Sequence, residues 1–352
     1  MNAGWALVAV AVGAAVAAAV AGAGWARRRG RRHDRDRLQA EVRPVLHHIL
    51  DEGHADLAIV AALPARQQRE LESLARAMLS KLRGQDREAL ARFLDARGAL
   101  EEARRQTRSR WARARSRASE LLGEAGAEDS VSDLVALLRD PNPRVSCSAA
   151  RALGRLGHPS AVTPLLVALE GHQSLPVDLV ADAILQIREC PVSLLRQGLR
   201  SRSVRTRAAA VELLGRFQAL SATDDMVERL RRDPSVEVRA RAARSLGRLS
   251  SSRAVDALIS CLEHESAPVR AQAAWALGQI AAPQAVPALQ ATLLGPSPHL
   301  SQLAAESLAA IDPFGVAVLR HVAEEIEGRP ADTARRALAS ARRYGEPLVV
   351  AG

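Results

Sequence analysis

The sequence predicts an all-α protein in which an α-solenoid of about seven stacked helix pairs follows a single transmembrane helix. Three observations support this fold class: a short signature that recurs at a constant interval, a composition rich in small aliphatic residues, and an uncharged N-terminal stretch. A fixed interval is typical of repeat proteins, whose units pack only on their neighbours. Solenoids present long surfaces, so we expect a binding function rather than an enclosed catalytic pocket.

The recurring signature is clearest in Ala152-Leu153-Gly154-Arg155-Leu156 and Ser245-Leu246-Gly247-Arg248-Leu249. Its first apolar position, a Leu or Ile, falls at residues 153, 184, 214, 246, 277, 308 and 338, at intervals of 30 to 32 residues. Leu122 precedes Leu153 by 31 residues, which predicts a degenerate first repeat ending near Leu122. Terminal repeats are often atypical because one of their faces must be capped.

The composition limits the core and the partners. Of the 352 residues 48% are hydrophobic but only 2% aromatic, which favours close-packed helices built from Ala, Leu and Val. The net charge of +10 comes almost entirely from arginine, since Lys81 is the only lysine, as in GC-rich bacterial coding. This charge permits an anionic partner. Cys147, Cys190 and Cys261 lie far apart without a CxxC motif, which excludes a disulfide framework and a Cys-rich zinc site.

Residues 1–26 are predicted to form a membrane anchor. No charge occurs from Trp5 to Trp25, and about 20 apolar residues span a bilayer as a helix. Basic residues follow this stretch and none precedes it, which predicts an outside N-terminus and a cytoplasmic solenoid at a bacterial plasma membrane. Cleavage after Ala21-Gly22-Ala23 stays open as an alternative. The basic cluster is interpreted as a stop-transfer signal that also contacts anionic lipid headgroups: Arg27, Arg28, Arg29, Arg31 and Arg32.

The remaining chain divides into four predicted segments. They are a basic juxtamembrane stem at 27–40, a divergent helical region at 41–122, the solenoid at 123–345 and a tail at 346–352. Apolar spacing and breaker residues predict helices in the divergent region. Their expected ranges are Glu41–Leu50, Leu57–Leu63, Arg66–Leu82, Arg87–Ala96 and a long helix that includes Arg108–Arg117 and ends near Gly123.

Each repeat is predicted to hold a first helix, a tight turn and a second helix. First helices begin as in Ala254-Val255 and Ala285-Val286-Pro287, where proline is tolerated in the first turn. Asp140 and Asp233 stand in the turns and are expected to cap the second helices. Gly157 is expected to end its helix in the left-handed conformation.

The frame V-R-x-x-A-A-x-x-L-G-x-[IL] followed by A-V-x-x-L resembles HEAT repeats, in particular the short variety of bacterial scaffolds and phycobilin lyases. The residues from Val238 to Leu249 match it best, and the resemblance covers residues 123–345. It implies an α-solenoid but leaves the function open. It also implies that Asp233 and Arg239 belong to a structural ladder between adjacent repeats, whereas Ser146 replaces the corresponding Arg after Asp140.

Three enzyme classes have folds related to HEAT solenoids. The His-Glu pairs of deoxyhypusine hydroxylases are replaced, for example by Cys147-Ser148 and Ala208-Ala209, so no metal or other cofactor is expected. The adjacent pair His47-His48 is interpreted as a solvated helix face. An alkylpurine DNA glycosylase would need more aromatic residues beside Trp111 than the sequence offers. A phycobilin-lyase-like accessory enzyme or a chaperone that uses the same groove stays open as the alternative.

The second helices carry the predicted binding surface. Positions five before, two before and two after the repeat apolar residue share one helix face, and in HEAT solenoids this face lines the concave side. Mixed charges there argue against nucleic acid. Trp275 is interpreted either as a binding hot spot or as packing against the next repeat. The predicted partner-binding residues are Arg151, Arg155, Glu212, Arg216, Arg241, Arg244, Arg248, Gln272, Trp275 and Gln279.

These patterns predict a non-enzymatic, membrane-tethered scaffold at the cytoplasmic face. Its expected partner is a membrane-associated protein, such as a glycosyltransferase or another integral-membrane enzyme.

Overall fold

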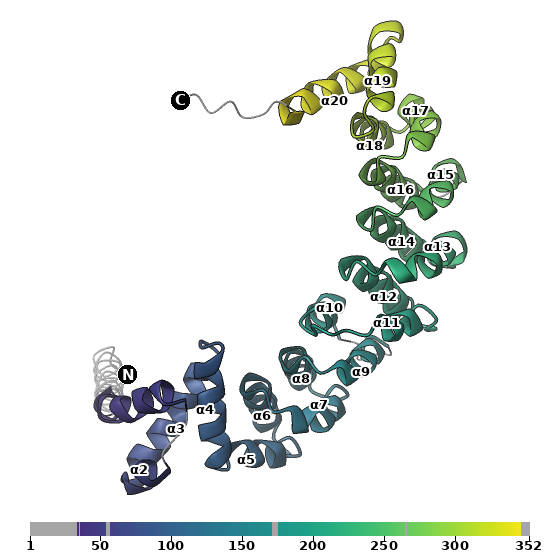
Figure 1. Ribbon diagram of the computed structural model, residues 1–352. Coiled ribbons are helices and arrows are strands. Elements are labelled where there is room, and N and C mark those ends of the chain that lie inside the picture. The colour runs from purple at the N-terminus through teal and green to yellow at the C-terminus, as the bar shows by residue number, and fades with distance from the viewer. Residues whose placement is uncertain (1–33, 35, 54–56, 171–174, 265, 346–352) are drawn as a thin grey trace, which may run out of the picture. The chain divides into compact units, whose positions relative to one another are not determined.

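The computed structural model describes residues 34, 36–53, 57–170, 175–264 and 266–345, and all regular elements among them are helical (Figure 1). The chain forms two compact units, Met1–Ala127 and Glu128–Gly352. No helix within the described residues is long and apolar enough to cross a bilayer. The predicted transmembrane segment and its arginine cluster lie outside the described residues.

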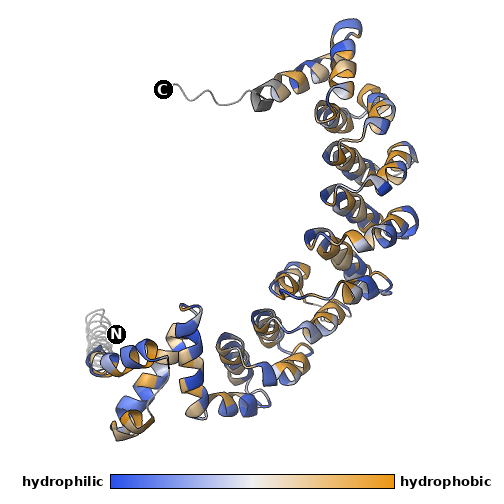
Figure 2. Cartoon of the chain, viewed as in Figure 1, coloured by the Kyte–Doolittle hydropathy of each residue, from blue (hydrophilic) through white to orange (hydrophobic). Residues whose placement is uncertain are grey.

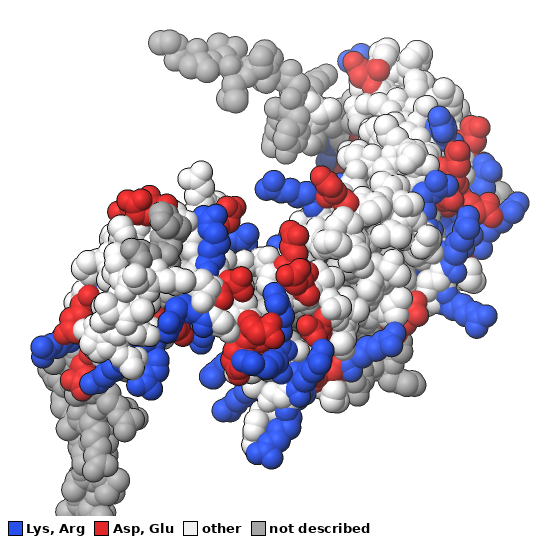
Figure 3. Space-filling view, turned by 60° about the horizontal axis from the view of Figure 1, so that its bottom comes forward, with Lys and Arg blue, Asp and Glu red and all other residues white. Residues whose placement is uncertain are grey.

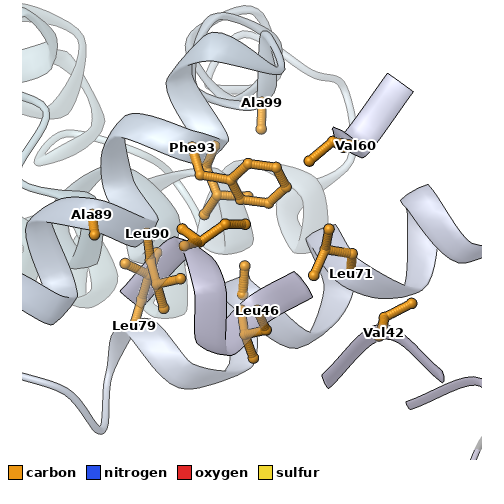
Figure 4. Close-up of a cluster of buried hydrophobic side chains, with 12 residues drawn as sticks. Val42, Leu46, Val60, Leu71, Leu79, Ala89, Leu90, Phe93 and Ala99 are labelled. Carbon is orange, nitrogen blue, oxygen red and sulfur yellow. The ribbon is translucent and has the colours of Figure 1, made fainter. Parts of the chain in front are cut away.

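The first unit is a small helical domain with its own core. Residues 36–51 are helical. Phe93, Leu90 and Leu79 are fully buried against Leu46 and Leu71 from neighbouring helices, as Figure 4 shows. The helices that follow residues 36–51 are α2 (Leu57–Ala62), α3 (Ala65–Leu79), α4 (Gln85–Ala96), α5 (Ala99–Gln106) and α6 (Ala112–Ala125).

The prediction of one long helix through Arg108–Arg117 is wrong. Helix α5 ends at Gln106, and α6 begins only at Ala112. The Thr107 hydroxyl donates to the carbonyl of Arg104, and the Trp111 amide donates to the Ser109 hydroxyl. Ser and Thr side chains compete in this way with helix hydrogen bonds. Helices α5 and α6 therefore form a pair, and Leu122 is fully buried on α6, as the degenerate first repeat requires.

The second unit consists of seven helix pairs within its described residues. Figure 1 shows the first helices of successive pairs in one row and the second helices in another, on the inner side of the unit's curve. Apolar and polar residues alternate along both rows (Figure 2). The pairs are α7 (Val131–Leu137) with α8 (Pro143–Leu156), α9 (Val162–Val167) with α10 (Val177–Leu185), α11 (Val192–Gly198) with α12 (Val204–Arg216), α13 (Thr223–Arg232) with α14 (Val236–Arg248), α15 (Val255–His264) with α16 (Ala267–Ile280), α17 (Val286–Leu294) with α18 (Pro298–Ala309), and α19 (Phe314–Glu325) with α20 (Arg329–Gly345).

The predicted register of the repeats is confirmed. The apolar residues at 153, 184, 214, 246, 277 and 308 are all 0% exposed. Leu338 is only half-buried, because α20 is the last helix of the described array and no further pair covers it.

Small residues set the spacing of the second-helix row. A β-carbon added at Gly247 would lie 2.7 Å from the α- and β-carbons of Ala276 on the next second helix. Equivalent close approaches join Gly154 to Ala183, Gly215 to Ser245 and Gly278 to Ser307. At the junction of α10 with α12 the corresponding positions hold Leu185 and Leu213. The bulk of two leucines prevents the same close approach there.

The caps of the second helices differ in part from expectation. Asn142, not Asp140, caps α8 by accepting from the Arg144 amide. Asp140 and Asp233 instead accept from amides two residues further on, within the turns that precede the helices. Hydrogen bonds of this span are typical of Asx turns. Gly157 has φ of 70°, as its predicted role at the helix end requires.

The interrepeat ladder uses a different arginine from the one predicted. The Asp233 carboxylate accepts hydrogen bonds from Nε and Nη2 of Arg207, at 2.7 and 2.9 Å, one repeat earlier. Arg239 donates to the main-chain carbonyl of Asp233 at 2.7 Å. An Arg on one second helix thus reaches the turn before the next, which ties adjacent pairs together.

Candidate functional site

The predicted binding residues lie on four second helices. Arg151 and Arg155 are exposed on α8, and Glu212 and Arg216 lie on α12. The arginines at 241, 244 and 248 belong to α14, whereas the residues at 272, 275 and 279 belong to α16. Consecutive second helices pack side by side, so the structure brings together the residues of α12, α14 and α16 but not those of α8.

A hollow of about 600 Å³ forms the centre of this surface, and we call it the central hollow. Five predicted residues line it, together with residues from α10 and from the starts of α14 and α16. The lining consists of Asp178, Glu212, Val236, Glu237, Ala240, Arg241, Arg244, Ser245, Arg248, Pro268 and Gln272.

Glu212 bridges two repeats at one wall of the central hollow. Its carboxylate accepts from Arg216 on the same helix at 2.8 Å and forms a short contact with Arg241 on α14. Arg241 also pairs with Glu237 at 3.0 Å, one turn away. These carboxylates therefore neutralise two of the four arginines that gather here.

Arg244 and Arg248 have no such partner. Among the described residues no carboxylate lies within ion-pair distance of either guanidinium group. Burial lowers the pKa of Arg248, the positive charges of Arg244 and Arg216 lower it further, and the charge of Glu212 opposes this effect. Like charges held together in a partly desolvated site are unfavourable until an anion neutralises them.

Trp275 lies beside the central hollow rather than in it. Its half-buried ring packs so closely on α14 that a β-carbon at Gly247 would lie 3.0 Å from the ring. The Arg244 guanidinium lies over the Trp275 ring, 5.9 Å from the ring centroid, a distance typical of a cation–π interaction. Trp275 therefore positions Arg244 as well as filling space between two repeats.

Sequence reasoning missed the acidic and apolar members of the site. Asp178 lies on α10 and lines both the central hollow and a smaller one of about 220 Å³ between α10 and α12. Glu237 stands one helical turn before Arg241, a spacing that could have indicated the pair. Val236 and Pro268 begin their helices and supply apolar surface at the rim.

Other features of the described residues do not form a comparable site. No group of three or more His, Cys, Asp and Glu residues with metal-binding geometry occurs among them. Burial raises the pKa of the Cys190 thiol to about 11, which keeps it protonated and a poor nucleophile. His47 and His48 are both exposed. A hollow of about 630 Å³ between α7 and α9 lies on the first-helix row and holds Arg139 as its one arginine.

Charges of both signs are distributed over the protein surface. Figure 3 shows acidic and basic side chains interspersed on the face that it presents. A phosphodiester backbone places a negative charge at every step, so its binding surfaces are more uniformly basic.

Comparisons with known proteins identify the repeat. The sequence model of the family described as HEAT repeats matches residues 100–184, 192–268, 223–309 and 255–343. The first match begins at α5 and thus includes the degenerate first pair. No curated protein matches the chain.

Solved structures similar to this chain are also helical repeat proteins. Kap121p bound to Nup53p is 13% identical with a TM-score of 0.54, and the match covers 80% of this chain and 38% of Kap121p. Kap121p bound to the SUMO protease Ulp1p is 14% identical with a TM-score of 0.54, over 79% and 36% of the two chains. Human deoxyhypusine hydroxylase is 18% identical over 87% of this chain and 97% of its own, with a TM-score of 0.31.

Proposed function

Because the chain belongs to the HEAT-repeat family, we propose that it is a non-enzymatic scaffold that binds a protein partner through its second-helix row. The observation that carries this proposal is the central hollow, where polar, charged and apolar side chains from four adjacent repeats line one concave surface. Mixed surfaces of this kind suit a protein rather than a nucleic acid. Kap121p, which has the same fold, is bound to Nup53p and to Ulp1p in its solved structures.

The proposal includes a membrane tether. The uncharged stretch from Trp5 to Trp25 and the arginines that follow it support a single span with the solenoid in the cytoplasm of a bacterial cell. A tether raises the effective concentration of the solenoid near membrane proteins without any new contact. An integral-membrane enzyme such as a glycosyltransferase is therefore the partner class that we propose.

Site-specific photo-crosslinking tests the binding surface. A photoreactive residue placed at Arg151 or Gln279, both exposed on the second-helix row, is expected to capture the same protein in living cells. The matched controls are Thr163 and Asp256, which are exposed on first helices and should capture none of it. Equal capture from both rows, or none from the second-helix row, would show that this surface does not bind the partner.

A topology reporter tests the tether separately. We expect activity from a reporter enzyme that functions in the cytoplasm when it is fused after Gly352, and none from a periplasmic reporter at the same position. By the positive-inside rule, the side of the span that carries the arginines stays in the cytoplasm. Activity of a periplasmic reporter, or a mature chain that begins near Gly24, would contradict the proposed orientation.

A further inference from the structure

We propose that the partner presents an acidic segment to the central hollow, with one carboxylate bound between Arg244 and Arg248 and an apolar side chain beside it. This inference rests on the proposed function, since it specifies the partner of the same surface. It identifies the partner by chemistry: an Asp- or Glu-containing peptide with a neighbouring aliphatic residue.

The central hollow already holds one carboxylate in this manner. Glu212 lies between Arg216 and Arg241 and contacts both. Arg244 and Arg248 stand one turn apart on α14, face the same hollow and have no such group between them. Carboxylates of the protein itself thus neutralise two of the four arginines. A carboxylate of the partner would neutralise the charge of the other two.

Without a partner, Arg248 lies in an unfavourable charge environment. Its guanidinium is partly buried, and its nearest charged neighbours include two arginines. Like charges that converge in a partly desolvated site repel one another. A bound carboxylate converts this repulsion into attraction, and a planar guanidinium can donate two hydrogen bonds to it.

The walls of the hollow decide between a peptide and other anions. Asp178, Glu212 and Glu237 line it, so a chain that carries a charge at every unit would meet repulsion on two sides. A peptide can place a single carboxylate at the arginines and neutral residues elsewhere. The Gln272 amide also lines the hollow and offers both a donor and an acceptor, which match a peptide backbone but not a phosphate.

The apolar part of the partner follows from the rim. Val236 is 39% exposed at the start of α14, and Pro268 is exposed at the start of α16. Both residues line the central hollow, as does Ala240. Exposed aliphatic surface next to two uncompensated arginines fits an aliphatic side chain adjacent to the acidic one.

Fluorescence anisotropy with the full-length chain in detergent micelles tests this inference. The probe is a short fluorescein-labelled peptide with one Glu next to a Leu among neutral residues, and its control is the same peptide with Gln in place of Glu. We expect the Glu peptide to bind and the Gln peptide to bind at least about tenfold more weakly, since a charged hydrogen-bond pair is worth about 1.5–3 kcal/mol. Arg244→Gln and Arg248→Gln should each weaken binding of the Glu peptide about tenfold.

Arg231→Gln is the matched control variant, because Arg231 is exposed on α13 in the first-helix row and does not line the hollow. It should leave the affinity for the Glu peptide unchanged. Arg244 is exposed, so its replacement should leave the thermal unfolding of the chain unchanged. Equal affinities for the Glu and Gln peptides, or equal losses in all three variants, would overturn the inference. Tighter binding of single-stranded RNA than of the Glu peptide would overturn it in favour of a nucleic-acid surface.

Failure of this inference is distinguishable from failure of the proposed function. If the photoreactive residues on the second-helix row capture a partner and the Glu peptide does not bind, the scaffold function stands and the acidic segment is wrong. If no partner is captured from that row, the scaffold function itself fails.

Discussion

Replacement of Asp233 by alanine is expected to lower the free energy of unfolding by about 3 to 5 kcal/mol, because it leaves the Arg207 guanidinium buried without its counterion. The side chains of Arg207 and Asp233 are 8% and 0% exposed, and two hydrogen bonds join them. The pair also links α12 to the turn before α14, so both repeats lose a connection. Chemical denaturation of the full-length chain measures the loss.

The matched control is Asp224→Ala. Asp224 pairs with Arg253 at 3.8 Å, but these side chains are 82% and 71% exposed. Ion pairs at the surface contribute about 0 to 1 kcal/mol, so this variant should remain close to the parent. Equal stabilities of the Asp233→Ala and Asp224→Ala variants would show that the buried pair does not hold the two repeats together.

The same pair gives a pH dependence with a definite sign. Burial acts to raise the pKa of Asp233, but hydrogen bonds from Arg207 and the Ser235 amide, with the charges of Arg207 and Arg229, hold it below its ordinary value. A carboxyl group with a lowered pKa stabilises the fold above its unfolded-state pKa, and this contribution disappears as pH falls through its folded-state pKa. The parent should therefore lose stability below about pH 4 more steeply than Asp233→Asn.

Leu246→Ala is expected to lower the free energy of unfolding by about 2 to 5 kcal/mol, since it leaves a cavity in a fully buried site. Leu246 lies on α14, which packs on α12, α13 and α16. Because solenoid stability depends on interfaces between neighbours, the loss should extend to the adjacent pairs. Thermal unfolding followed by circular dichroism is the measurement.

Leu220 provides the control for this substitution. It is 61% exposed, so Leu220→Ala removes the same atoms without opening a core cavity. The two variants should differ clearly in unfolding temperature. If Leu246→Ala unfolds like Leu220→Ala, the repeat register is wrong.

The sequence alone predicted the helical class, the repeat interval and the burial of the repeat leucines. Each of these features depends on residues within a single repeat, and the same residue pattern recurs in successive repeats along the chain. Leu153 and Leu308 are buried for the same reason as Leu246, because each occupies the same place in its helix pair. The ridge on the second helices was predictable from helical periodicity in the same way.

The remaining features depend on contacts between repeats, which no single repeat encodes. Asp233 could be matched by spacing to Arg239, but its carboxylate pairs with Arg207 one repeat earlier. Asp178 lines the central hollow from α10, although a whole repeat lies between its helix pair and the pair that contains α14. The interruption between α5 and α6 depends on hydrogen bonds of the hydroxyl groups of Thr107 and Ser109. The spacing of apolar residues, on which the helix prediction was based, contains no information about these bonds.

The junction of α10 with α12 determines how far a disturbance can travel along the array. In a stack coupled only through nearest neighbours, the loosest junction separates blocks that open and close independently. Leu185 and Leu213 replace the glycine and small residue that join other second helices, and a small hollow lies at this junction. The pairs from α11 onward are therefore expected to open and close together. Asp178, which lines the central hollow from α10, lies on the other side of this junction.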